Sequence, residues 1–274
     1  MSKKVVVSGS FDNLHSCDVR FLQQASSFGQ LHVLLWSDRV ARDLAGKEPG
    51  FPEDERLYFL QAIRYVKRVS LVTGIFDRDT LPKVNGLQAD IWIVDDKGDT
   101  TEKRSYAKSI RLAYQVLTPT DLGGFPITNN AQSNGSPARK KVLVTGCFDW
   151  FHSGHVRFFE ETSKLGDLYV VVGHDKNVRL LKGDEHPLFS QDERRYMVAS
   201  VRFVKQALIS TGHGWMDAEP EIARIRPDIY AVNEDGDKPE KRAFCQQHGI
   251  DYVVLKRTPK VGLPRRESKH LRGF

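Results

Sequence analysis

Two histidines spaced three residues apart stand where phosphate chemistry is expected. His152 and His155 lie in the stretch 146–155 (GCFDWFHSGH), after the apolar run 141–145 and at the start of a segment with helical apolar spacing. A helix N-terminus presents unpaired N–H groups and attracts phosphate, and two imidazoles there can donate hydrogen bonds as charge grows in a transition state. Gly154 has no Cβ, which lets a nucleotide approach the backbone. The alternative, that the histidines only cap the helix, is disfavoured by the whole pattern GxFDxxHxGH.

The elements that position this turn alternate between strands and helices. A helix is expected at 155–165, and Ser190 with Glu193 forms a capping box that opens another. The inward-facing residues of that second helix are Met197, Val198, Val201 and Val204. Apolar runs predict strands at 141–145, 167–172, 206–209, 229–232 and 252–255. The alternation predicts an α/β fold with a parallel, doubly wound, Rossmann-like sheet, in which ligands bind beyond the carboxyl ends of the strands.

The chain contains two copies of this pattern. The first block is identical at 12 of 20 positions at an offset of 137 residues, and two further blocks follow at an offset of 138. The matching blocks are 3–22 with 140–159, 54–68 with 192–206, and 89–105 with 227–243. Residues 123–137 are rich in Gly, Pro, Asn and Ser, which is typical of a linker. We therefore expect two tandem Rossmann-like domains, 1–122 and 139–274, joined by a linker at 123–138.

The first copy lacks the chemical groups of the second. Its turn reads HSCD at 15–18, so that Cys17 replaces the glycine and Asp18 replaces the second histidine. A carboxylate there repels a triphosphate and opposes the helix dipole. Ala45 stands in place of Lys182, and the copy ends without an arginine-rich segment. The first copy is therefore expected to be inactive, and whether it binds a ligand, such as a regulatory nucleotide, stays open.

Composition and charge argue against several classes of protein. Among the 274 residues, 40% are hydrophobic and 28% charged, which is typical of a globular chain, and no apolar run approaches the roughly 18 residues that span a bilayer. The three cysteines form no CxxC pair and no metal-binding spacing, which fits a cytoplasmic protein with reduced thiols. The net charge of +6 permits binding of polyanions, but acidic and basic residues are interspersed along the chain. This favours phosphorylated small molecules over nucleic acid.

The second copy resembles the HxGH nucleotidyltransferases, and among them the cytidylyltransferase-like group. The resemblance rests on the first turn, on Lys182-Gly183 ("KG"), on Glu193-Arg194 ("ER"), and on 257–272, which is similar to the closing loop "RT…GISSTxLR". At positions 267–269, where small hydroxyl residues are usual, only Ser268 keeps a hydroxyl, and Glu267 and Lys269 stand beside it. The first copy then resembles a degenerate member of the same family.

The resemblance implies a set of site residues in the second copy. The residues expected to be catalytic, by stabilising charge at the α-phosphate, are His152, His155 and Lys182. The residues expected to bind the nucleotide are Gly146, Cys147, Phe148, Asp149, Gly154, Arg257 and Ser268. Trp150 and Trp215 are candidate walls for the acceptor or the base, and no residue is assigned to a metal. Simpler roles stay open for several of these, namely a capping carboxylate at position 149, a surface lysine at 182 and packing tryptophans at 150 and 215.

The implied reaction is nucleotidyl transfer. A phosphorylated alcohol would attack the α-phosphate of a nucleoside triphosphate and release pyrophosphate, with CTP expected and ATP as the alternative. Mg²⁺ would be held mainly by the phosphates, since it needs few protein ligands. The expected partners are these two substrates, and no membrane. The two copies would pair as an intramolecular pseudo-dimer, with further homo-oligomerisation left open. A non-catalytic nucleotide-binding or scaffold protein is the alternative from another class.

Overall fold

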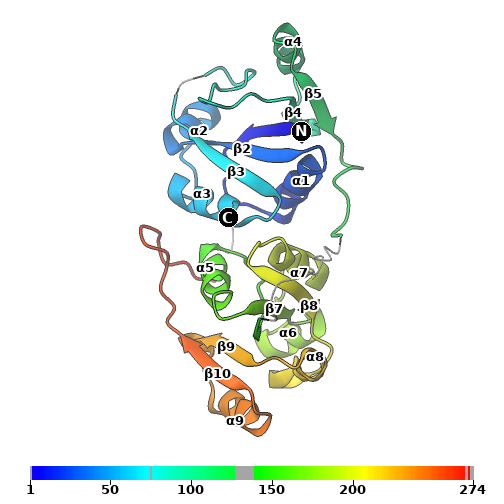
Figure 1. Cartoon of the computed structure of the whole chain (residues 1–274), viewed down its shortest axis with the longest axis vertical. Helices are drawn as coiled ribbons and strands as arrows, with labels where there is room; N and C mark the ends of the chain where they lie inside the picture. Colours follow the sequence, from blue (N-terminus) through cyan, green and yellow to red (C-terminus); the bar gives the residue numbers. More distant parts are fainter. Residues whose placement is uncertain (1, 75, 127–138, 269–270, 272–274) are drawn as a thin grey trace. The chain divides into compact units, whose positions relative to one another are not determined.

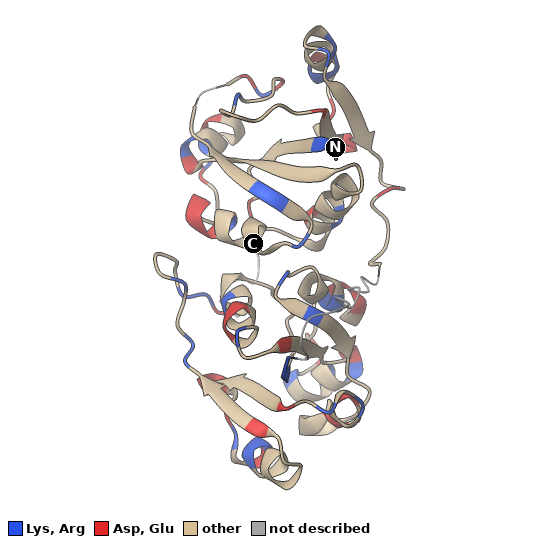
Figure 2. Ribbon diagram, viewed as in Figure 1, with Lys and Arg blue, Asp and Glu red and all other residues tan. Residues whose placement is uncertain are grey.

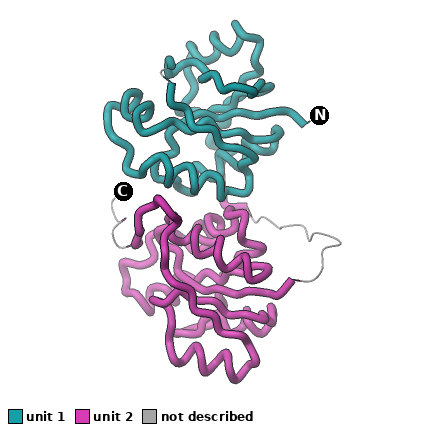
Figure 3. Tube along the Cα trace, turned by 60° about the vertical axis from the view of Figure 1, so that its left-hand side comes forward, with its two compact units in different colours: residues 1–124, 274 teal, residues 125–273 magenta. Residues whose placement is uncertain are grey.

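The computed structural model describes residues 2–74, 76–126, 139–268 and 271. These residues form two compact units, which divide in the sequence between Gly124 and Phe125 (Figure 3). The division falls inside the expected linker, and residues 127–138 of that linker lie outside the described residues. We call residues up to Gly124 unit 1 and those from Phe125 onward unit 2.

Unit 1 alternates strands and helices from its start (Figure 1). Its strands are β1 (Lys4–Gly9), β2 (Gln30–Trp36), β3 (Val66–Val72), β4 (Ile91–Asp95) and β5 (Ala113–Leu117). Its helices are α1 (Ser16–Ser26), α2 (Asp38–Ala45), α3 (Glu53–Ala62) and α4 (Thr101–Ser109), with a short 3-10 turn η1 (Asp96–Gly98).

Unit 2 repeats the same series of elements. Its strands are β6 (Lys141–Gly146), β7 (Asp167–Val172), β8 (Val204–Ile209), β9 (Ile229–Asn233) and β10 (Asp251–Leu255). Its helices are α5 (Ser153–Thr162), α6 (Asp175–Lys182), α7 (Gln191–Ala199), α8 (Glu219–Ile225) and α9 (Pro239–Gln247). The 3-10 turns η2 (Gly214–Met216) and η3 (Glu234–Gly236) complete it.

Each unit is built on one five-stranded parallel sheet. The strand order is β3-β2-β1-β4-β5 in unit 1, and the corresponding order β8-β7-β6-β9-β10 in unit 2. The first strand of each unit is central and pairs with strands on both sides. Val142, Leu143 and Val144 of β6 are fully buried, as expected for a parallel strand covered on both faces. The expected α/β fold with two Rossmann-like sheets is therefore confirmed.

The register of β6 opens a crevice at one end of the sheet. β6 pairs with β7 along its whole length, from Lys141 to Gly146, but with β9 only at Val142 and Leu143. Beyond that point, the carboxyl ends of β6 and β9 are not paired with each other. From β6 the chain adds β7 and β8 on one side of the sheet and then crosses to add β9 and β10 on the other side. The boundary between β6 and β9 is therefore the switch point, where ligands bind in such folds.

Two predicted helices differ in extent from those in the structure. The helix expected at 155–165 runs over Ser153–Thr162. The helix opened by Ser190 ends at Ala199, so Val201 and Val204 are not part of it. Both valines are buried, because Val201 lies in the turn after α7 and Val204 begins β8. Apolar residues that continue from a helix into a strand gave the false impression of one longer helix.

Candidate active site

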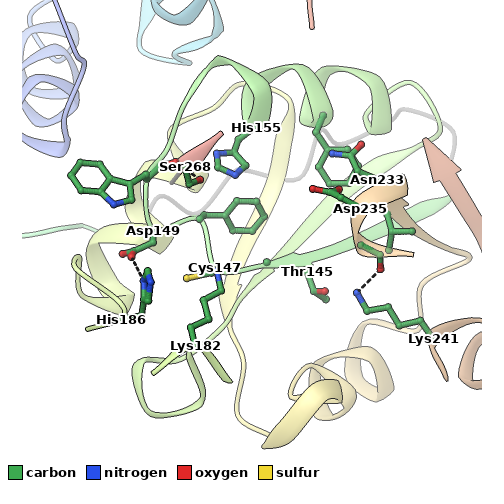
Figure 4. Close-up of a pocket in the computed structure, with 16 residues that line it drawn as sticks. Thr145, Cys147, Asp149, His155, Lys182, His186, Asn233, Asp235, Lys241 and Ser268 are labelled. Atoms are coloured by element: carbon green, nitrogen blue, oxygen red, sulfur yellow. Dashed lines mark hydrogen bonds and ion pairs between the residues drawn. The ribbon is translucent and has the colours of Figure 1, made fainter. Parts of the chain in front are cut away.

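A cavity of about 550 Å³ lies at the crevice between the carboxyl ends of β6 and β9 (Figure 4). Its volume falls in the range of small-molecule sites. The residues that line it are Thr145, Gly146, Cys147, Phe148, Asp149, Trp150, His155, Phe158, Lys182, His186, Val232, Asn233, Asp235, Gly236, Lys241 and Ser268. Among the residues assigned from sequence, six in the first turn, together with Lys182 and Ser268, thus meet in one place.

The turn between β6 and α5 is tight and leaves no room for a side chain at Gly146. A Cβ there would lie 2.7 Å from the ring of Phe148, whose own backbone is in the left-handed region with a φ of 54°. The Phe148 ring is buried and packs edge-on against His155 at 5.3 Å between centroids. Phe148 therefore supports the histidine from behind while it also lines the cavity.

The two histidines cap α5 with one ring nitrogen each. Nδ1 of His152 accepts a hydrogen bond from the backbone N–H of Gly154 at 3.1 Å, and Nδ1 of His155 accepts from the N–H of His152 at 3.4 Å. A neutral ring whose Nδ1 accepts carries its proton on Nε2. Both rings therefore offer an Nε2–H group, and that of His152 is buried without a hydrogen-bond partner among the described residues. The capping role and a phosphate-binding role are compatible, because they use different nitrogens.

The rings are held neutral by burial in a positive surrounding. Burial, reinforced by Arg257 and Arg266, lowers the pKa of His152 to about 3. Burial also lowers the pKa of His155 well below its usual value, and His152, Arg257 and Lys182 add to this effect. The His152 and His155 rings stack with 4.0 Å between their centroids. Positive charges on both rings would therefore repel each other strongly. Near neutral pH the site thus presents two uncharged N–H donors close to the cations Lys182 and Arg257.

Gly154 has a different structural reason from the one expected. A Cβ at this position would lie 2.9 Å from the ring of His152, so the glycine makes room for the capping imidazole. Neither Gly154 nor His152 lines the large cavity; Gly154 and Arg257 line a small adjoining cavity of about 20 Å³. In unit 1, where Cys17 stands at the glycine position, the histidine ring makes other contacts, which are described below.

Asp149 anchors the loop that follows α6. Its carboxylate accepts hydrogen bonds from the backbone N–H groups of Leu188 and Phe189, at 2.9 and 3.1 Å to Oδ1, and Oδ2 lies 3.3 Å from Nδ1 of His186. Asp12 of unit 1 makes the same two backbone contacts, with Gly50 and Phe51. The capping alternative for Asp149 thus fits the structure.

Arg194 ties four segments around the site together, a role that the sequence analysis did not assign. Its guanidinium donates to the carbonyl oxygens of Phe189, Cys147 and Gly173 and to the carboxylate of Asp175, over 2.6–3.0 Å. The side chain is only 1% exposed. The "ER" pair at 193–194 was the available signal, because a buried arginine is seldom found without a set of acceptors.

The remaining assigned residues differ in how close they lie to the cavity. Lys182 ends α6 and lines the cavity, and Ser268 lines it too, with Oγ 3.3 Å from the carbonyl oxygen of Trp150. Arg257 forms an ion pair with Asp235 at 2.8 Å and donates to the carbonyl oxygen of Arg266. Trp215 is 52% exposed in η2 and lines neither cavity, so the structure does not support it as a wall of this site.

The loop residues that depart from the family pattern differ in what the structure shows. The carboxylate of Glu267 lies 3.8 Å from Nε of Arg265 and does not line the large cavity. Lys269 lies outside the described residues. The cavity is also lined by Asn233 and Asp235, and by His186 and Lys241, which sequence reasoning missed.

The described part of the chain was expected to contain no membrane-spanning helix and no metal-binding cluster. There, no helix is long and apolar enough to cross a membrane, and no group of three or more His, Cys, Asp or Glu side chains could hold a metal ion. Lys and Arg side chains are interspersed with Asp and Glu on both units (Figure 2).

Unit 2 thus has a parallel sheet with an imidazole-capped helix at its switch point. The family model for cytidylyltransferase-like proteins matches residues 143–272. The chain is 39% identical to the FAD synthase of Aciduliprofundum boonei, over 42% of this chain and 76% of that protein. It is 40% identical to the FAD synthase of Ferroglobus placidus, over 43% of this chain and 75% of that protein. The chain belongs to the cytidylyltransferase-like family of the HxGH nucleotidyltransferases, and it is a nucleotidyltransferase.

Two further proteins are similar to part of the chain. The bifunctional protein HldE of Campylobacter concisus is 36% identical over 35% of this chain and 20% of that protein. The crystal structure of a lipopolysaccharide core biosynthesis protein from Thermoplasma volcanium matches 45% of this chain and 99% of that chain, with 27% identity and a TM-score of 0.38.

Acid should destabilise unit 2 through His152. The ring of an unfolded histidine takes up a proton near pH 6.5, whereas the folded ring resists protonation down to about pH 3. Between these values the unfolded chain binds more protons, so the free energy of unfolding should fall by about 1.4 kcal/mol for each pH unit below 6.5. Urea unfolding at pH 7.5 and pH 4.5 measures this loss.

The matched variant for that measurement is His152→Asn. Asparagine keeps an N-cap acceptor but does not titrate. The variant should therefore lose less stability than the wild-type protein between the two pH values. Equal losses in both proteins would show that His152 is not the buried neutral group described above.

Proposed function

We propose that the site in unit 2 transfers a nucleotidyl group from a nucleoside triphosphate to a phosphorylated small molecule, with ATP as the favoured nucleotide. The observation that carries this proposal is the pair of neutral imidazoles fixed at the N-terminus of α5, each with its proton on Nε2. Such fixed donors stabilise charge that develops on phosphate oxygens, and they need no rearrangement during the reaction.

The reaction needs no protein nucleophile. An oxygen of the acceptor phosphate forms a bond to the α-phosphorus, the bond from that phosphorus to the bridging oxygen breaks, and pyrophosphate leaves with the electron pair. No proton has to move, because both the attacking and the leaving group are ionised phosphates. The protein contributes alignment and charge stabilisation, for which we propose His152, His155, Lys182 and Arg257.

The choice of ATP rests on the relatives. Relatives 31–40% identical to the chain are named FAD synthase, and forming FAD requires joining an adenylyl group to a flavin phosphate. The second candidate is cytidylyl transfer from CTP, which the family name favours and which we expected from the sequence. Both candidates use the same phosphate chemistry and differ only in the base.

Mg²⁺ fits this site as a companion of the triphosphate. Asp149 already accepts hydrogen bonds from two backbone groups, and Asp235 is paired with Arg257, so neither carboxylate is available as an uncommitted ligand. Mg²⁺ commonly binds through substrate phosphates and water with few protein ligands, and there it would neutralise phosphate charge. We expect calorimetry to show tight Mg²⁺ binding only when the nucleotide is present; tight binding to the protein alone would contradict this.

We propose that unit 1 is not a second active site. Asp18 makes the capping contact that His155 makes in unit 2, because its Oδ2 accepts a hydrogen bond from the N–H of His15 at 2.8 Å. Unlike an imidazole, its carboxylate has no N–H group to donate to a phosphate. The amide of Asn13 lies 2.9 Å from Nε2 of His15, whereas Trp150 stands at the matching position in unit 2. The ring nitrogen that could face a phosphate is thus already engaged within unit 1.

Pyrophosphate release tests the proposal. The full chain would be mixed with Mg²⁺, with ATP or CTP, and with a panel of acceptors that includes FMN, sugar phosphates, polyol phosphates and amino-alcohol phosphates. We expect release with ATP and one class of acceptor, and none without acceptor. Release with CTP and an acceptor, but not with ATP, would favour the second candidate. Nucleotide binding without turnover across the panel would contradict the enzymatic proposal.

A further inference from the structure

We propose that His186, oriented by Asp149, binds the phosphate group of the acceptor substrate. This inference rests on the proposed function and names the part of the site that receives the second substrate. None of the sequence motifs pointed to this residue. It enters the site from the loop after α6, and its ring lines the same cavity as His155 and Lys182.

The cavity has two sides with different charged groups (Figure 4). Asn233, Asp235 and Lys241 lie on one side, and Asp149, Lys182 and His186 lie on the other, with His155 between them. Asp235 is paired with Arg257, so the arginine of the closing segment belongs to the side of β9. In-line transfer at the α-phosphate requires the attacking group to approach opposite the leaving pyrophosphate. If Arg257 holds the nucleotide phosphates, the side of Lys182 and His186 remains for the acceptor.

Asp149 fixes the His186 ring from behind. The Asp149 side chain is 5% exposed, and Oδ2 lies 3.3 Å from Nδ1 of His186. A carboxylate at this distance accepts a hydrogen bond from an Nδ1–H group of the ring. In the proposed complex both ring nitrogens carry a proton, so that the ring donates to Asp149 through Nδ1 and to the phosphate dianion through Nε2. The Asp149 carboxylate is itself held by the N–H groups of Leu188 and Phe189, so the ring is attached to a rigid support.

Unit 1 contains the same contacts between an aspartate and its loop, but without a histidine beside the aspartate. Asp12 holds its loop through the N–H groups of Gly50 and Phe51, as Asp149 does in unit 2. The residue two positions before Gly50 is Glu48, which pairs with Arg42 at 3.0 Å. The loop clamp therefore does not require an imidazole. The histidine occurs in the unit that also contains Lys182, His152 and His155, whereas the other unit has an acid at this position.

A phosphate monoester acceptor requires positive charge on its side of the cavity. It carries up to two negative charges and must approach a triphosphate that carries several more, so repulsion has to be offset locally. Lys182 supplies a mobile point charge, and His186 supplies a directed donor on a supported ring. Together they form a site for a phosphate dianion and exclude acceptors that lack one.

The variant His186→Glu tests this assignment in the full chain. Unit 1 shows that the loop tolerates glutamate at this position, so the variant should fold. With the acceptor identified by pyrophosphate release, its KM for that acceptor should rise about 10- to 100-fold, while the KM for ATP changes by less than about twofold. His186→Arg should restore acceptor binding to within a few-fold, because it returns a cation. Leu188→Glu is the matched control, since it adds the same charge to an exposed side chain of the same loop.

The outcomes separate this inference from the proposed function. A rise in acceptor KM no larger than that of Leu188→Glu, or an equal rise for ATP, would overturn the role of His186 while leaving the enzyme established. If the wild-type chain releases no pyrophosphate with any acceptor, the proposed function fails, and the ring signals of His186 during NMR titration with inorganic phosphate decide instead. A saturable shift of these signals supports the phosphate site; no shift overturns it.

Discussion

The variant His155→Asp should lower kcat by at least about a thousandfold with little change in stability. Removing one fixed donor at a developing oxyanion costs about 100- to 1000-fold, and a carboxylate facing the phosphates adds repulsion. Stability should be retained, because Asp18 holds the equivalent position in unit 1 and accepts the N–H of His15 at 2.8 Å. Steady-state pyrophosphate release and urea unfolding measure the two effects.

The control for this prediction lies in the other unit. Asp18→Asn changes the matching residue of unit 1 and keeps an acceptor for the N–H of His15. Turnover should stay within about twofold of the wild-type rate, because the chemistry is assigned to unit 2. If Asp18→Asn abolished turnover while His155→Asp kept it, the assignment of the active unit would be reversed.

The variant Arg194→Met should destabilise unit 2 by about 3–5 kcal/mol. Arg194 is almost fully buried and satisfies the carbonyl oxygens of Phe189, Cys147 and Gly173 together with Asp175. Methionine fills a similar volume but leaves these acceptors without their donor, and the carboxylate without its counter-charge. The first turn and the loop after α6 would both lose an anchor. Urea unfolding followed by circular dichroism measures the loss.

Arg179→Met is the matched control for Arg194→Met. Arg179 lies exposed on α6, so the same substitution should change the free energy of unfolding by less than about 0.5 kcal/mol. A loss below about 1 kcal/mol in Arg194→Met would show that the four contacts are not what holds these segments together. Arg56 makes the same kind of contacts in unit 1, with Phe51, Ser10, Trp36 and Asp38.

The fold could be predicted from the sequence where burial leaves a strong pattern. The strand predicted at 167–172 coincides with β7, and the other four predicted strands of unit 2 differ from the observed ones by one or two residues at an end. Parallel strands are covered on both faces, so they are continuous apolar runs between turn residues. Helices α6, α8 and α9 were not predicted, because all three are short, and α6 also depends on His174 as its N-cap.

The site could be predicted in part, where a residue's role follows from its place in the chain. The first turn is local, and His155 and Asp149, which were assigned from it, both line the cavity. His186, Asp235 and Lys241 come from segments far apart in sequence, and only the sheet brings them together. At Gly154 the structure adds a reason that the sequence does not reveal, because a Cβ there would meet the His152 ring. Trp215 lines neither cavity, and an aromatic residue in a glycine-rich turn gives no sign of its direction in the sequence.

A crystal structure with the non-hydrolysable nucleotide α,β-methylene-ATP and Mg²⁺ tests the central claim most directly. We predict nucleotide in unit 2, with phosphate oxygens within hydrogen-bond distance of Nε2 of both His152 and His155, and none at the turn of His15. Nucleotide bound only in unit 1, with the rings of unit 2 out of reach of any phosphate, would contradict the account.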